Sequence, residues 1–202
     1  MTEPAFSGRI LRRFVEAAAV ELGTDQLNAM LALSKLPAAW TEPATFRKMN
    51  ELESARTYAS MQAAMRAYYG RGARGVLLRV GQRLWHNLLE DAALASKAQA
   101  AVVKRLPLVS RRKAALELLS RFLGARPGDI TLHTLDLDLL LADHVSPTTE
   151  GCTSSSPVCF VTLGLIHESL LWATGQRYDV KETSCKARGD TDCEFRITTE
   201  NK

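Results

Sequence analysis

All four cysteines of the chain follow residue 150, at positions Cys152, Cys159, Cys185 and Cys193. Core cysteines scattered through a fold would not be expected to gather at one end of the sequence. Thiolate sulfur is a preferred ligand of zinc, so two cysteines held on neighbouring strands form a natural half-site for that ion. This end of the chain is therefore the first candidate for a metal site.

The last two of these cysteines share a short pattern with a glutamate. Glu182, Cys185 and Cys193 form the spacing E-x-x-C-x7-C, and the residues around them predict two strands joined by a tight turn at residues 187–190. Side chains along a strand alternate between the two faces of a sheet. The three side chains can therefore converge only if a bend or bulge near Ser184 turns one of them.

A third sulfur can reach the hairpin from a helix. Cys159 lies in the first turn of the helix predicted after Pro157, where the helix N-terminus favours the thiolate. Three sulfurs and the Glu182 carboxylate would form a closed tetrahedral site, which is structural because no position is left for water. Cys152 is the alternative fourth ligand. The spacing alone is equally consistent with buried thiols that pack as small apolar side chains.

The elements that must position these residues change in kind near residue 127. Before it, apolar residues recur at helical spacing, with Ser7 and Thr24 as caps and glycines between residues 69 and 81 that end one helix and let the next pack closely. Helices are predicted at residues 8–22, from 24 to near Pro37, and at 45–68, 76–88, 94–103 and 111–123. Two prolines, Pro37 and Pro43, mark a looser stretch.

The pattern after residue 127 predicts strands. Residues 129–144 are partly alternating and are expected to form one or two strands, 145–156 a polar loop, and 158–174 a helix before the C-terminal hairpin. N-terminal helices followed by an antiparallel sheet indicate an α+β fold. We expect residues 1–55 to form a helical arm and residues 56–202 to form the main domain.

Composition narrows the class of protein. The 202 residues are 46% hydrophobic and 24% charged, and no run approaches the ~20 apolar residues of a membrane span. The N-terminus does not resemble a signal peptide, so a cytoplasmic location is expected. The densest basic stretch, residues 104–113, could contact nucleic acid or an anionic membrane, but is interpreted as a solvated helix face. Neither direct nucleic-acid binding nor membrane insertion is expected.

The C-terminal segment carries a longer motif. Residues 178–197 read YDVKETSCKARGDTDCEFRI, and this stretch resembles the C-terminal signature of 4-vinyl-reductase domains, V-x-E-x-x-C-x-A-x-G-x-x-x-C-x-F-x-I. The matching residues are Val180, Glu182, Cys185, Ala187, Gly189, Cys193, Phe195 and Ile197. Pro157-Val158-Cys159 is similar to the helix start of the same family. Residues 74–81 resemble a stretch in the related sensor domains of phenol- and toluene-responsive regulators.

The resemblance implies a fold, a metal and a function. It implies zinc held by Cys159, Glu182, Cys185 and Cys193, a homodimer, and a cavity between sheet and helices, as in a trafficking-complex subunit and the haem nitric-oxide-binding domain. The expected function is binding or sensing of a hydrocarbon or other small apolar ligand, which makes residues 56–202 a small-molecule-binding domain of the 4-vinyl-reductase type. Aromatic and apolar side chains are the common lining of such cavities. The candidate lining residues are Tyr68, Trp85, Phe160, Leu163 and Trp172.

Two alternatives to a sensor remain open. The family name suggests a carrier of a tetrapyrrole, such as a bacteriochlorophyll precursor, or an accessory protein of a vinyl reductase. A scaffold subunit without a ligand is the other. Residues 130–144 contain no aromatic residue, whereas the phenol sensors place tryptophan in the corresponding strands, which argues against phenol as the ligand. The sequence predicts no catalytic site, and no pattern selects a histidine as a haem ligand.

Overall fold

The computed structural model describes residues 6–33 and 43–198. Its helices precede the sheet, apart from α8, which lies between the second and third strands in the sequence. The helices are α1 (Gly8–Leu22), α2 (Thr24–Leu33), α3 (Pro43–Arg47), α4 (Glu51–Tyr69), α5 (Ala73–Glu90), α6 (Leu94–Val103), α7 (Leu108–Leu123) and α8 (Phe160–Thr174). The predicted α+β order is therefore confirmed. The predicted helix end near Pro37 lies outside the described residues.

Local signals account for the starts of α1 and α4. The Ser7 side chain accepts a hydrogen bond from the Ile10 N–H and caps α1, as predicted. The helix predicted from Thr45 to Tyr68 is instead divided into α3 and α4. The division arises because Asn50 and Glu53 form a capping box, in which each side chain accepts from the other's backbone N–H at 2.9 Å.

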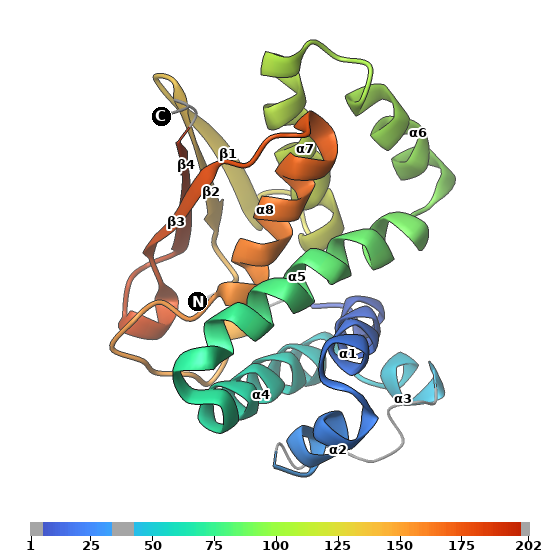
Figure 1. Ribbon diagram of the computed structural model, residues 1–202, viewed down its shortest axis with the longest axis vertical. Helices are drawn as coiled ribbons and strands as arrows, with labels where there is room; N and C mark the ends of the chain where they lie inside the picture. Colours follow the sequence, from blue (N-terminus) through green and yellow to red (C-terminus); the bar gives the residue numbers. More distant parts are fainter. Residues whose placement is uncertain (1–5, 34–42, 199–202) are drawn as a thin grey trace.

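The sheet has the strand order β1-β2-β4-β3, and every neighbouring pair is antiparallel. Its strands are β1 (Ile130–Leu135), β2 (Asp138–Asp143), β3 (Asp179–Ser184) and β4 (Cys193–Thr198). Residues 129–144 thus form two strands, joined by a turn in which Asp136 adopts a positive φ of 53°. One face buries Leu141 and Phe195 in the core shared with α8, and Figure 1 shows α8 lying against the sheet.

Helices α5 and α8 touch through their backbones. A Cβ atom added at Gly81 would lie 2.2 Å from the Val161 carbonyl oxygen, and one at Gly164 would lie 2.2 Å from the Leu78 carbonyl oxygen. Only glycine permits such an approach. The expectation that glycines of residues 69–81 allow close helix packing is therefore met at Gly81. Figure 1 shows α5 crossing α8 beside the sheet.

The N-terminal helices share the core of the rest of the molecule. Leu11 and Phe14 of α1 are fully buried in the same apolar cluster as residues of α5, α8 and the sheet. The boundary proposed between residues 55 and 56 falls within α4, and the division into an arm and a domain remains a proposal. No helix in the described ranges is long and apolar enough to cross a membrane.

Candidate metal centre

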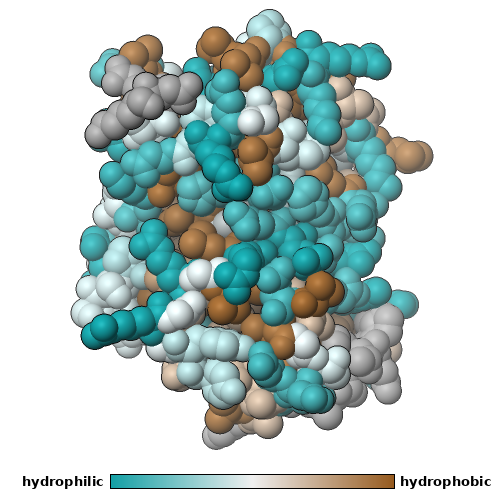
Figure 2. All heavy atoms as spheres, viewed as in Figure 1, coloured by the Kyte–Doolittle hydropathy of each residue, from teal (hydrophilic) through white to brown (hydrophobic). Residues whose placement is uncertain are grey.

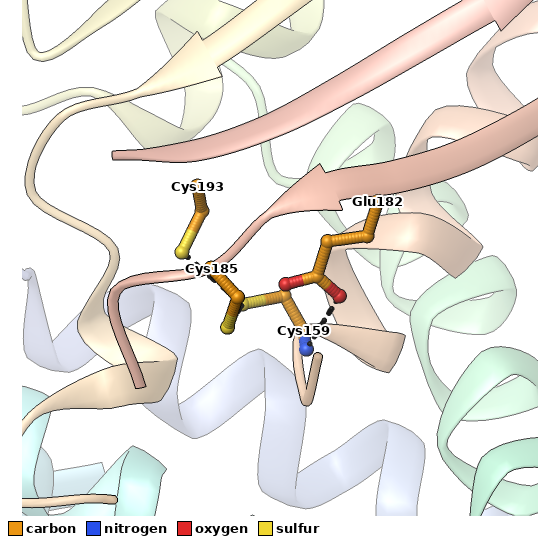
Figure 3. A group of neighbouring side chains, drawn as sticks. All are labelled: Cys159, Glu182, Cys185 and Cys193. Carbon is orange, nitrogen blue, oxygen red and sulfur yellow. Dashed lines mark hydrogen bonds between the residues drawn. The ribbon is translucent and has the colours of Figure 1, made fainter. Parts of the chain in front are cut away.

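Cys159, Glu182, Cys185 and Cys193 converge at the N-terminal end of α8 (Figure 3). Cys159 occupies the N-cap position of α8, directly before the helix, and not its first turn as predicted. Glu182 lies on β3, Cys185 directly follows β3, and Cys193 begins β4. One possible ligand atom from each residue lies within 4.8 Å of those of the other three. The Cys159 sulfur is 3.5 Å from that of Cys193 and 4.0 Å from that of Cys185.

An irregularity in the hairpin makes this convergence possible. Glu182 pairs with Phe195, but Ser184 pairs with Glu194, so the register of β3 against β4 shifts between Glu182 and Ser184. Without the shift, Cys185 would point to the opposite face from Glu182. The shift occurs at the predicted position, near Ser184, and turns the Cys185 side chain inward, where it is fully buried.

Backbone donors hold the site. The Cys159 N–H donates to Glu182 Oε2 at 3.1 Å, and the Lys186 N–H donates to the Cys193 sulfur at 3.3 Å. The Cys185 N–H donates to Asp190 Oδ2 at 2.7 Å, which fixes the turn after the bulge. Donors of this kind, together with the positive end of α8, favour negative charge on the cluster.

The side chains of the cluster compete for protons. Hydrogen bonding to Cys185 and Cys193, with burial, raises the pKa of the Cys159 thiol well above its usual value. Hydrogen bonding to Cys159, and then to Cys193, lowers the pKa of the Cys185 thiol. Burial, and then the neighbouring Cys185, raises the pKa of Glu182 to about 8. Full ionisation of all four groups therefore requires a cation close by.

The geometry fits a metal ion. Sulfurs at ~2.3 Å from a tetrahedral ion would be roughly 3.8 Å apart, and the two separations measured from Cys159 fall on either side of that value. Glu182 Oε1 is buried and has no hydrogen-bond partner among the described residues. Buried polar atoms are normally paired, so an ion would satisfy this oxygen. The four residues thus lie close enough to hold a metal ion.

Cys152, the alternative fourth ligand, lies outside this group. Its sulfur instead accepts a hydrogen bond from Arg66 Nη2 at 3.3 Å, and the side chain is partly exposed.

The residues predicted to line a ligand cavity do not gather in one place. Phe160 and Leu163 line a groove of about 510 Å³ beside the metal centre, together with Arg74, Ser156, Pro157, Lys181 and Glu182. Trp85 is fully buried, with its ring centroid 5.4 Å from that of Trp172. Tyr68 is 55% exposed and packs on Tyr69. The groove is thus built from only part of the predicted set.

Sequence reasoning missed the polar residues near these sites. Arg74 and Lys181 line the groove. Arg74 belongs to the glycine-rich stretch and Lys181 precedes Glu182, so both were within reach of motif analysis. Tyr58 and Asp143 border a cavity between α4 and the sheet. It offers about 10 Å³ to a water-sized molecule, roughly one water. No sequence signal marks these two residues, because their burial depends on helix packing.

One known family model matches a segment in the C-terminal part of the chain. Residues 144–199 match the family model of the 4-vinyl-reductase domain. All four residues of the metal centre lie within this matched segment. The resemblance seen in the sequence is therefore confirmed there. No curated protein matches the chain at the level of sequence.

Several solved structures are similar to this one. An H-NOX protein from S. oneidensis in the Fe(II)NO ligation state is 15% identical, with a TM-score of 0.55 over 96% of this chain and 99% of that one. The Fe(II) unliganded H-NOX protein from K. algicida is 10% identical, with a TM-score of 0.58 over 97% of both chains. The phenol-responsive sensory domain of PoxR is 14% identical, with a TM-score of 0.48 over 69% and 73%. The H-NOX matches confirm the predicted fold.

Proposed function

We propose that this protein is a small-molecule-binding sensor module whose C-terminal hairpin is fixed to α8 by a structural zinc ion. The observation that carries the proposal is the convergence of Cys159, Glu182, Cys185 and Cys193 from three separate elements. Soft thiolate ligands in a tetrahedral arrangement favour zinc over magnesium, calcium or manganese. Because the four side chains would complete the coordination shell, the ion would stabilise the fold and would not bind substrate.

The ligand of the proposed sensor would occupy the groove beside the metal centre. Its volume of about 510 Å³ is within the usual range for small-molecule sites, roughly 300–1,000 Å³. Phe160 and Leu163 supply apolar lining, and Arg74, Lys181 and Glu182 supply charged groups. H-NOX structures of the same fold are described with NO or CO bound to Fe(II), which supports a role in binding small ligands.

Glu182 belongs to both the groove and the metal centre. A ligand that presses on this side chain would therefore act on β3 and on the N-terminus of α8 together. Signalling requires that the ligand bind one arrangement of these elements more tightly than another. A homodimer that passes on this change, in the cytoplasm, is part of the proposal.

Elemental analysis and native mass spectrometry test the metal. We expect one zinc ion per chain, and we expect Cys185→Ser to lose zinc and to melt at a lower temperature, because a structural ion stabilises the fold directly. Cys152→Ser is the matched control, since Cys152 lies outside the cluster, and it should keep both. The metal proposal is wrong if wild-type protein carries no stoichiometric metal, or if Cys185→Ser retains it.

Fluorescence of 1-anilinonaphthalene-8-sulfonate tests the groove. The dye offers an apolar ring system for Phe160 and a sulfonate for Arg74 and Lys181. Phe160→Ala should weaken its binding, whereas Tyr68→Ala, which alters an exposed side chain outside the groove, should not. Equal weakening by both variants, or by neither, would rule out the groove as the site.

A further inference from the structure

Positive charge is concentrated between α6 and α7. Residues 92–116, here called the α6–α7 corner, contain six basic residues and no acidic residue. The basic residues are Lys97, Lys104, Arg105, Arg111, Arg112 and Lys113. The chain as a whole carries a net charge of +4, so the remainder carries −2. The corner therefore differs in sign from the rest of the molecule.

Large aliphatic side chains on the same corner face water. Leu94 is 85% exposed, Val109 is 72% exposed, and Val102 and Leu108 are about half-exposed. A single exposed leucine is ordinary on a protein surface, but several close together usually mark an interaction site. The corner thus combines apolar surface with unbalanced positive charge.

The cations of the corner lack acidic partners. Arginines elsewhere form ion pairs, such as Arg13 with Asp91 and Arg196 with Asp138, but no basic residue of the corner pairs with a carboxylate of the described ranges. Lys104 and Arg112 lie over the rings of Trp172 and Tyr178. These contacts leave the positive charge of the corner uncompensated.

The shape of the molecule makes this surface accessible. Figure 1 shows the α6–α7 connection at one end of the long axis, opposite α2 and α3. Figure 2 shows hydrophobic and hydrophilic side chains interspersed at that end. The β1–β2 turn, with exposed Leu135 and Leu137, lies at the same end. A flat partner could therefore reach the α6–α7 connection and the β1–β2 turn together without disturbing the core.

We propose that the α6–α7 corner binds the surface of an anionic lipid bilayer. Lysine and arginine side chains would lie among the negatively charged headgroups, and the exposed aliphatic side chains would enter the interfacial region. Protein interfaces are generally depleted in lysine. The phosphate backbone of a nucleic acid is contacted by charged and polar groups, so exposed valine and leucine would find no partner there. The combination on this corner fits a bilayer better than either.

Co-sedimentation with vesicles tests the proposal. Binding is expected to phosphatidylcholine vesicles that contain about 30% phosphatidylserine, and to weaken with added salt because the charges are exposed. The double variant Arg105→Gln/Lys113→Gln should bind about 30-fold more weakly, at about 1 kcal/mol for each cation removed. Val109→Asn should lower binding by at least about 3-fold through lost apolar contact. None of these positions is packed in the core.

Arg71→Gln is the matched control, because Arg71 is an exposed cation outside the corner, and it should bind as the wild type does. Equal binding to pure phosphatidylcholine, or no binding to either vesicle, would overturn the proposal. So would an unchanged affinity of Val109→Asn combined with tight binding of duplex DNA, because the corner would then be a nucleic-acid site. Self-association that depends on Val109 without vesicle binding would equally refute it.

Discussion

Substitution of Gly81 by alanine tests the crossing of α5 and α8. The new methyl carbon would lie 2.2 Å from the Val161 carbonyl oxygen, more than an ångström closer than ordinary van der Waals contact. That oxygen belongs to the backbone and cannot rotate away, so the helices must separate. Overpacking of this kind costs about 3 kcal/mol at the upper end of its usual range. The higher helix propensity of alanine offsets about 1 kcal/mol of this cost. The free energy of unfolding should therefore fall by about 2 kcal/mol.

Gly75→Ala on the same helix is the control. Its added Cβ would meet only the flexible end of Arg79, at 3.7 Å, so we expect it to stabilise the protein by up to about 1 kcal/mol. Urea denaturation of the two variants should therefore differ by about 3 kcal/mol. Gly164→Ala should resemble Gly81→Ala, and the double variant should cost less than their sum, because one separation of the helices relieves both contacts. A Gly81→Ala protein as stable as Gly75→Ala would refute the close crossing.

Two further variants test other parts of the fold. Burial raises the pKa of Asp143 to about 6, so its contribution to stability is fully present below pH ~3.8 and is lost as the pH rises through ~6. The free energy of unfolding of Asp143→Asn should therefore rise relative to that of the wild type by up to about 3 kcal/mol between pH 4 and pH 7. A difference between the two proteins that does not vary with pH would contradict this. Asn50→Ala should lose about 1 kcal/mol with its capping box. An unchanged melting temperature would show that the cap is not needed.

The sequence predicted the fold best where the signals were local. The cap at Ser7 and the glycines Gly23 and Gly175 mark the ends of α1 and the end of α8, and the turn at Gly189, with a φ of 95°, joins the last two strands. The start of α8 was predicted too early, because the helix begins at Phe160, after Pro157 and Val158. The break between α3 and α4 could also have been predicted from the sequence, because Asn50 and Glu53 have the spacing of a capping box. It was overlooked because the apolar spacing continues across the break.

The convergence of the four side chains at the candidate metal centre was predictable for a different reason. Alternation along a strand placed Glu182 and Cys185 on opposite faces, so their convergence demanded an irregularity, and the register shift lies there. No comparable constraint in the sequence predicts the ligand groove. Helical spacing indicates that Trp85 and Phe160 are apolar positions, but only tertiary packing decides that one is fully buried and the other lines a groove.

The same arrangement gives the proposed sensor a route away from its groove. Glu182 accepts from the Cys159 N–H at the start of α8, so the hairpin and this helix are bound at one point. Further along α8, Gly164 meets α5 through the backbone, with no side chain between the two helices to absorb a displacement. A shift at the N-terminus of α8 must therefore move α5 or break this contact. Residues 91–93 connect α5 directly to α6. A ligand in the groove of the proposed sensor would therefore displace the α6–α7 corner as well.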